Sequence, residues 1–300
     1  MKPIIRILII VALFFRRFGR GRPVPHAIVL TLLVAARFLR RFGRGLRSPV
    51  AMVSSLISAS LFLLAWEVVA RAGFTPITLF PPPSRVVLAL VELARSGELA
   101  RDLKASLWRA ALGFLLGASA GVLIGLATGR VSWIDHVLSP IIQMFRPIPP
   151  VAAIPLIITW LGVTDFSKVF SIAFAVFLVV WINAHLGARE IPRTFIWSAR
   201  TLRLHGLALL GKVIFPGSLP YVVAGCRNGL AIAFIMVYVS ELAGASAGVG
   251  YQISVSQLAY RIDRMIAALA VLGLCGAAAD LLLTLVLRLL FPWLRFTTFK

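Results

Sequence analysis

Residues 107–128 read LWRAALGFLLGASAGVLIGLAT, an apolar run in which glycine recurs every four residues, at positions 113, 117, 121 and 125, and once more at 129. About 20 apolar residues in a helix cross the ~30 Å hydrocarbon core of a bilayer. Glycines spaced by four lie on one helix face and let a second backbone approach closely. The run predicts a membrane-spanning helix packed against another helix, which is either fixed within one subunit or slides during transport.

Five further runs are long enough to cross a membrane, at residues 52–69, 137–161, 169–187, 221–240 and 265–290. The chain is 60% hydrophobic and 14% charged, whereas about a quarter of the residues of soluble domains are charged. Strands that span a bilayer close into barrels and alternate polar with apolar residues, and these runs do not alternate. We therefore expect an all-α, polytopic membrane protein with about six transmembrane helices.

The distribution of basic residues predicts how the chain is oriented. Cytoplasmic loops of membrane proteins carry an excess of Lys and Arg. With both termini inside, the cytoplasmic segments would hold 20 of the 31 basic residues. We therefore expect cytoplasmic N and C termini, and we interpret the net charge of +21 as a topology signal that does not indicate nucleic acid as a partner.

The first 51 residues differ in composition from the rest of the chain. They carry 11 basic residues and no acid, and the sequence FFRRFGRG at 14–21 is nearly repeated as FLRRFGRG at 38–45. Each copy follows about a dozen apolar residues, as in helices that lie in the membrane interface. We expect a basic cytoplasmic or interfacial leader that contacts anionic membrane lipids, before a membrane domain at 52–300. The alternatives are a dispensable tail and a true start at Met52.

The run at 137–161 contains RPIPP at 146–150, whose prolines must kink or break a helix. Broken backbone at membrane depth is tolerated where it is buried in protein or lines a cavity. The sequence therefore predicts that a pathway passes this point.

Charged residues within the apolar runs are costly in a membrane and become candidates for function. The candidates are Glu67, Arg146, Arg227 and Asp280 within the runs and Glu241 at the end of one. Glu241 lies near the end of its run, where it could instead reach outer water. The two arginines could extend toward the cytoplasmic interface, pair with a buried acid, or form an electropositive lining that favours anionic cargo. The candidates for the translocation pathway are Arg146, Pro147, Pro149, Pro150, Arg227 and Glu241.

A cytoplasmic stretch at 188–219 joins two of the expected spans. Within it, residues 197–210 predict an amphipathic helix that suits docking into a groove on a soluble partner. Gly206, Gly211 and Lys212 have the spacing of a phosphate-binding GxxxxGK loop. Val213 stands where that motif needs Ser or Thr, and the strand that should precede the loop is missing. We therefore do not expect this stretch to bind ATP.

This stretch resembles the cytoplasmic loop of the inner-membrane permeases of binding-protein-dependent ABC importers. Their pattern is EAA, three residues, Gly, nine residues, Ile, one residue and Leu-Pro. Trp197 replaces the acid and Arg203 replaces the glycine, which leaves the turn geometry open. The matching positions are Ser198, Ala199, Val213, Phe215 and Pro216.

Further motifs are similar to the branch of that family that imports aliphatic sulfonates, taurine, nitrate and related small molecules. They occur in the same order, and the resemblance covers about residues 52–294. The motifs are LFPPPS at 79–84, RPIPP at 146–150, SARTL at 198–202, LPY at 219–221, ELAGA at 241–245 and GVGY at 248–251.

The resemblance implies a permease of the inner membrane with no catalytic residue, cofactor or metal of its own. Its partners would be a second copy of the permease, an extracytoplasmic solute-binding protein and two cytoplasmic ATPase subunits, which bind ATP and Mg. Sulfonate or taurine would be the leading cargo, followed by nitrate, with a heterocyclic vitamin precursor also open. The residues implied in coupling to the ATPase are Trp197, Ser198, Ala199, Arg200, Thr201, Leu202, Arg203, Gly206, Val213, Phe215 and Pro216.

Two other classes of protein are weighed against an importer permease. An ion-coupled secondary transporter needs acids near the midplane and usually internal repeats. Glu67 and Asp280 are candidate acids, but no pair of broken helices recurs in two halves. A membrane enzyme needs a cluster of catalytic groups, whereas the four histidines are scattered and the two cysteines lie in apolar runs without metal-ligand spacing.

Overall fold

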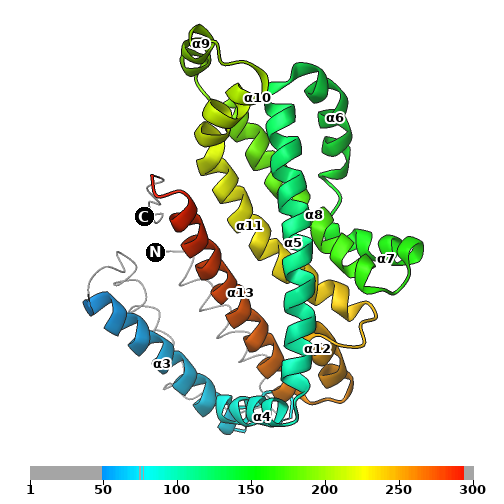
Figure 1. Ribbon diagram of the computed structural model, residues 1–300. Coiled ribbons are helices and arrows are strands. Elements are labelled where there is room, and N and C mark those ends of the chain that lie inside the picture. Colours follow the sequence, from blue (N-terminus) through cyan, green and yellow to red (C-terminus); the bar gives the residue numbers. More distant parts are fainter. Residues whose placement is uncertain (1–48, 74–75, 77, 294–300) are drawn as a thin grey trace, which may run out of the picture. The chain divides into compact units, whose positions relative to one another are not determined.

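The computed structural model describes residues 49–73, 76 and 78–293, and within this part the chain is helical without any strand. The expected all-α fold is confirmed. The two arginine-rich repeats fall outside the described residues, so the leader and the cytoplasmic placement of the termini stay predictions. The chain forms two compact units, whose helices are labelled in Figure 1. The first contains the residues up to Val91 together with 260–263, and the second contains Glu92–Ala259 and Arg264–Phe296.

The first unit contains α3 (Pro49–Arg71) and most of α4 (Pro83–Arg95). Glu67, near the end of α3, accepts hydrogen bonds from Arg71 Nε at 2.6 Å, Ser84 Oγ at 2.8 Å and the Ser84 N–H at 3.1 Å. A carboxylate at a helix N-terminus satisfies free N–H groups there. Glu67 thus connects the end of α3 to the start of α4.

The glycine face of α5 (Glu98–Arg130) packs against α8 (Asp165–Arg189) in the second unit. A Cβ added to Gly113 would lie 2.6 Å from Cβ of Ile172, and one added to Gly125 would lie 2.7 Å from Cβ of Ala184. Because the facing residue numbers rise together, the two helices run parallel. The expected close packing is confirmed, and the partner helix belongs to the same subunit.

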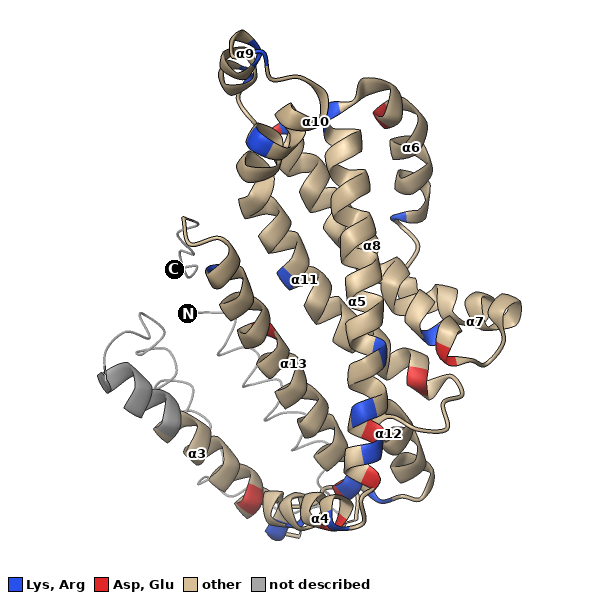
Figure 2. Cartoon of the chain, in the orientation of Figure 1, with Lys and Arg blue, Asp and Glu red and all other residues tan. Residues whose placement is uncertain are grey.

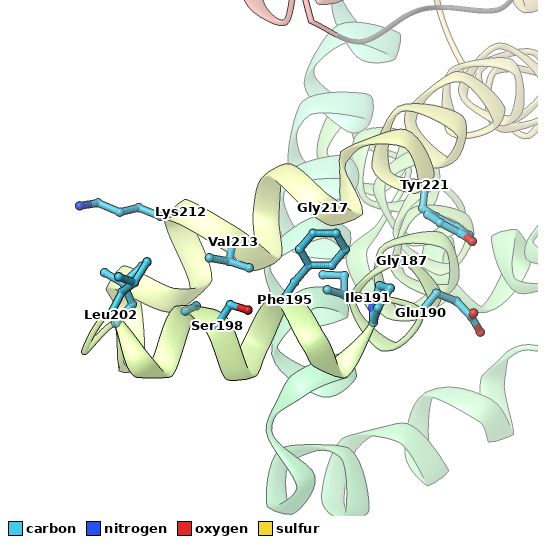
Figure 3. A pocket seen from close by; sticks show the side chains of 13 residues that line it. Gly187, Glu190, Ile191, Phe195, Ser198, Leu202, Lys212, Val213, Gly217 and Tyr221 are labelled. Carbon is cyan, nitrogen blue, oxygen red and sulfur yellow. The ribbon is translucent and has the colours of Figure 1, made fainter.

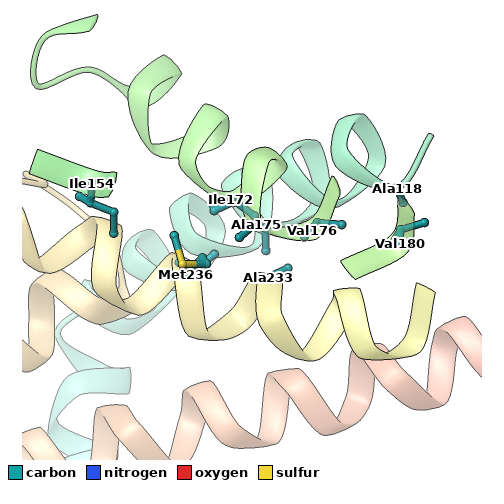
Figure 4. Packing of buried hydrophobic residues seen from close by; sticks show 10 residues of the cluster. Ala118, Ile154, Ile172, Ala175, Val176, Val180, Ala233 and Met236 are labelled. Carbon is teal, nitrogen blue, oxygen red and sulfur yellow. The ribbon is translucent and has the colours of Figure 1, made fainter. Parts of the chain in front are cut away.

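Helix α11 (Phe215–Leu242) covers another face of α8 and runs antiparallel to it. Its Gly225 faces Asn183, and Gly229 faces Val180. Between the three helices and α7 lies a core of small and branched side chains (Figure 4), which includes Ala118, Ile154, Ile172, Ala175, Val176, Val180, Ala233 and Met236. In a bilayer such packing, rather than removal from water, holds helices together.

The chain between α5 and α8 turns back through two helices, as a parallel pair requires. These are α6 (Ser132–Phe145) and α7 (Pro150–Leu161), which are bent by 96° relative to each other. Pro147, Pro149 and Pro150 remove three backbone donors at the bend. The predicted break within 137–161 is confirmed.

Four described helices are long and apolar enough to span a membrane, or five if α6 and α7 together count as one span. They are α5, α8, the continuous helical stretch Gly206–Leu242 and α13 (Ile262–Leu290). Helix α3 corresponds to the run at 52–69 and is not among them. The short helix α12 (Val249–Leu258) was not expected. Most helices extend beyond their apolar runs, and α5 begins nine residues before residue 107.

Candidate functional site

The segment after α8 forms a short helix, α9 (Arg193–Thr201), that ends in a tight turn. The expected helix at 197–210 is therefore wrong. The Leu204 N–H donates to the Ala199 carbonyl at 3.0 Å, and the Arg203 N–H donates to the Arg200 carbonyl at 2.9 Å. This pair of bonds is the Schellman C-cap, which places one residue in the left-handed conformation. That residue is Arg203, with φ of 58°.

The chain then re-enters the membrane helices through α10 (Gly206–Leu209) and the π-helical turn η1 (Leu210–Ile214). Pro216 lacks the N–H that would bond the Lys212 carbonyl, and the Phe215 N–H bonds Leu210 five residues back. The GxxxxGK spacing is thus built into helix, with no strand before it. That this stretch does not bind ATP stays a prediction.

A groove separates α9 from the segment that leads into α11. Its cavity volume is about 540 Å³, and its lining includes Phe195, Ser198, Ala199, Leu202 and Val213. Figure 3 shows Phe195 and Ser198 pointing from α9 toward Val213 and Gly217. Four of the predicted coupling residues, Ser198, Ala199, Leu202 and Val213, therefore come together at one place.

The two faces of α9 have different surroundings. Ile196 and Ala199 are buried, and Ile196 packs with Ile191 and Ile214 in a small apolar cluster. On the other side, Trp197 is 59% exposed. Leu202, which follows the last residue of α9 and lines the groove, is 75% exposed. The remaining predicted residues Arg200, Thr201, Arg203 and Gly206 are exposed, whereas Phe215 and Pro216 are half-buried at the start of α11.

Charged residues lie mostly toward the two ends of α5, α8 and α11, with few between (Figure 2). The groove beside α9 lies at one end, and a buried polar network lies at the other. The network is built on Arg109 and Glu241, whose side chains are 5% and 0% exposed and whose Nη1 and Oε1 atoms are 2.8 Å apart. Arg109 also binds Asp165, at 2.7 Å, and the Ala247 carbonyl.

The same network fixes the loop that follows α11. Glu241 accepts the Gly250 N–H at 2.8 Å, Ser106 Oγ accepts the Val249 N–H at 2.8 Å, and Asp102 accepts the Gly248 N–H at 3.1 Å. Ser106 Oγ lies 2.8 Å from both carboxylate oxygens of Glu241. Glu241 therefore does not reach outer water. Removing either Arg109 or Glu241 alone would leave the other charge buried and unpaired, at a cost of about 3–5 kcal/mol.

Sequence reasoning missed this network: it named Glu241 as a pathway candidate near the end of its run and gave it no partner. The signal was present, because Asp102, Ser106 and Arg109 follow one another at helical spacing and continue the face of Gly113 and Gly117. These polar residues point into the protein where the helix leaves its apolar run. Helix α5 begins before its apolar run because the face with Asp102, Ser106 and Arg109 has buried hydrogen-bond partners.

Arg227 and Asp280 form an ion pair between α11 and α13. Arg227 Nε donates to Oδ1 at 3.0 Å and Nη2 to Oδ2 at 2.8 Å, so the contact is bidentate. The side chains remain 42% and 38% exposed. Of the alternatives for Arg227, pairing with an acid is the one found, and its guanidinium already has a counter-ion.

Arg146 lies at the bend between α6 and α7. Its side chain is exposed and has no hydrogen-bond or ion-pair partner within the described part of the chain. The α6 C-terminus would favour the cation by only ~0.3–1 kcal/mol, whereas an arginine at the centre of a span costs ~2.5–3.5 kcal/mol. Arg146 therefore needs water or a counter-ion. Pro147 and Pro149 are exposed beside it, and Pro150 begins α7.

Comparison with known proteins identifies the family. Residues 113–296 match the family described as binding-protein-dependent transport system inner membrane component. A protein of Bacillus subtilis named as an aliphatic sulfonates transport permease, SsuC, is 36% identical over 76% of this chain and 83% of its own length. The taurine transport system permease protein TauC of Escherichia coli is 30% identical over 76% of this chain and 84% of its own.

Solved structures support the same fold. A chain of an amino acid ABC transporter is 19% identical with a TM-score of 0.54, covering 66% of this chain and 97% of that one. A chain of the MetNI methionine ABC transporter in an inward-facing conformation is 19% identical with a TM-score of 0.51, covering 65% and 94%. With its family match and its apolar spanning helices, this protein belongs to the inner membrane components of binding-protein-dependent transport systems.

Proposed function

We propose that this chain is the permease subunit of an ATP-binding cassette importer and forms the pathway for a small solute. The cargo class is an organic sulfonate, taurine or nitrate. Three relatives support it by name, those for aliphatic sulfonates and taurine described above and the nitrate import permease protein NrtB of Synechocystis, which is 28% identical over 63% of this chain. Family membership supports the role of permease.

The proposed assembly contains two copies of the permease, two cytoplasmic ATPase subunits and an extracytoplasmic solute-binding protein. ATP and Mg are bound and ATP is hydrolysed by the ATPase subunits, and this chain transmits the movement. Alternating access then follows from a rigid-body change that ATP binding to the partner favours.

The observation that carries the proposal is the surface of α9. This helix is held between α8 and α11 by its buried Ile196 and Ala199, and it presents Trp197 and Leu202 outward. A partner that binds Trp197 and Leu202 would transmit its movement to α8 and α11 through the buried residues of α9. The coupling residues are thus divided into a docking face and an anchoring face.

The test is the double substitution Trp197→Asp with Leu202→Asp, compared with Trp197→Phe with Leu202→Met. We expect the acidic pair to abolish co-purification of the ATPase subunit from mild detergent, because two desolvated charges would replace apolar contacts. The conservative pair should retain the ATPase. Neither variant changes Ile196 or Ala199, the residues that anchor α9, so both should keep the membrane fold.

Two outcomes would contradict the proposal. If the acidic pair retains the ATPase and continues to transport, α9 is not the docking element. If the unmodified chain binds no ATPase and its uptake follows a proton gradient, the protein is an ion-coupled secondary transporter, and Asp280 becomes the acid to examine.

A further inference from the structure

The backbone between α6 and α7 is exposed at membrane depth. Residues 143–149 are all exposed, and 146–149 lie outside regular helix. The Phe145 ring packs edge-on against Phe174 of α8, with centroids 6.4 Å apart. Phe174 is the tenth of the 25 residues of α8, so it lies about 14 Å from one end of that helix and about 22 Å from the other. The bend therefore lies well inside the span.

Lipid cannot satisfy such a segment. Backbone that leaves the helix at membrane depth must be covered by protein or face water. Two side chains there have free hydrogen-bonding groups as well. Gln143 and Arg146 are three residues apart on the same side of α6, both are exposed, and neither has a side-chain partner among the residues that the structure describes.

Three other cations of the packed helices each contact an acid. Arg109 binds Asp165 and Glu241, Lys168 lies 3.9 Å from Asp165, and Arg227 is occupied by Asp280. No acid contacts Arg146 within the described part of the chain, so its five N–H donors are available to a ligand. A guanidinium matches groups that offer two or three coplanar or convergent oxygens.

We propose that Arg146, assisted by Gln143, is the counter-charge that a monoanionic oxyanion group of the cargo meets halfway through the membrane. The inference rests on the proposed permease function and adds the residues that would meet the sulfonate group of the cargo or a nitrate ion. Arg227 does not serve this role, because a carboxylate of the same chain fills its donor fork.

The experiment measures uptake of ethanesulfonate and of nitrate by the complete transporter, with its ATPase subunits and solute-binding protein, in proteoliposomes. Arg146→Gln should lower uptake about tenfold or more at unchanged ATPase binding, and Arg146→Lys should retain more of it, because the positive charge remains. Gln143→Glu should also lower uptake, since its carboxylate would occupy Arg146 from one turn away. The matched control is Arg85→Gln in α4, which removes the same charge from an exposed arginine outside the proposed pathway and should stay within about twofold.

The outcomes separate this inference from the function on which it rests. If the unmodified chain does not bind the ATPase subunit, the proposed permease function is wrong. With an intact complex, wild-type uptake by Arg146→Gln would overturn the inference. Equal losses in Arg146→Gln and Arg146→Lys, or an equal loss in Arg85→Gln, would overturn it as well. If Arg146→Gln fails to assemble, wild-type uptake by Gln143→Glu overturns the inference and loss of uptake supports it.

Discussion

Arg203 shows how one residue can depart from a family pattern while the local structure persists. The permease pattern has glycine at this position, and the sequence alone left the turn open. The turn forms nevertheless, with Arg203 left-handed at φ of 58° and both Schellman bonds present. The cap holds because its two backbone bonds and the buried side of α9 fix the chain, while the strain stays local to one residue.

Arg203→Gly should stabilise the end of α9 by about 0.5–1 kcal/mol. The left-handed conformation costs a non-glycine residue ~1–2 kcal/mol, and the added freedom of glycine in the unfolded chain offsets part of the gain. Hydrogen exchange of the Arg203 and Leu204 amides measures it, and exchange should slow in the variant. Arg203→Ala is the control and should leave exchange unchanged. Faster exchange of these amides in Arg203→Gly would contradict the backbone strain inferred at position 203.

For single helices, the spacing of residues predicted which helix face packs closely against a partner. It did not predict where that face continues with polar residues that are also buried. The glycine spacing of α5 foretold a close helix partner, and the prolines at 147–150 foretold the break. The polar extension of the same face through Asp102, Ser106 and Arg109 was not predicted, because charged residues near a span end usually face water. Their partners come from more than 130 positions away, at Glu241 and Gly248.

The start and end of α9 show a second limit of local pattern. Apolar spacing continued from Trp197 to Leu210, so one helix was expected where two occur. The interruption comes from a cap that needs no glycine and no proline at the turn. Such a cap depends on the tertiary contacts of Ile196 and Ala199, which a single sequence does not reveal.

Gly125→Ala should destabilise the α5–α8 pair by about 1–3 kcal/mol. Its new Cβ would lie 2.7 Å from Cβ of Ala184 and 2.8 Å from the Trp181 carbonyl, and backbone cannot yield as a flexible side chain does. Gly273→Ala in α13 is the matched control, since nothing lies within 4 Å of its new Cβ, and helix propensity should make it neutral or stabilising. Thermal unfolding in mild detergent compares them. Equal midpoints would refute the close contact.

Across the second unit as a whole, the helices differ in how firmly they are held. The apolar span of α13 is 17% buried, against 39% for α5 and 56% for α8. Backbone-close contact leaves α5 and α8 little freedom to slide, because a shift of one residue would bring larger side chains onto the glycine positions. We therefore expect α5 and α8 to move together and α13 to move separately.

Spin labels test this expectation in the assembled transporter. Labels at Leu123 of α5 and Leu186 of α8, both exposed, should keep one distance between the nucleotide-free and ATP-trapped states. Labels at Leu123 and Leu282 of α13 should change theirs. Diluting labelled chains into unlabelled ones removes distances between copies. A change in the first pair as large as in the second would show that α5 and α8 slide.

The parallel arrangement of α5 and α8 also has a consequence for biosynthesis. Facing positions such as Gly113 and Ile172 are 59 residues apart in the chain, and at ~5–20 residues per second a ribosome needs ~3–12 s to bridge them. During that interval α5 sits in the membrane with its glycine ridge and Arg109 unpaired. We therefore expect the nascent chain to need the insertion machinery or chaperones to cover this face of α5 until α8 has been synthesised.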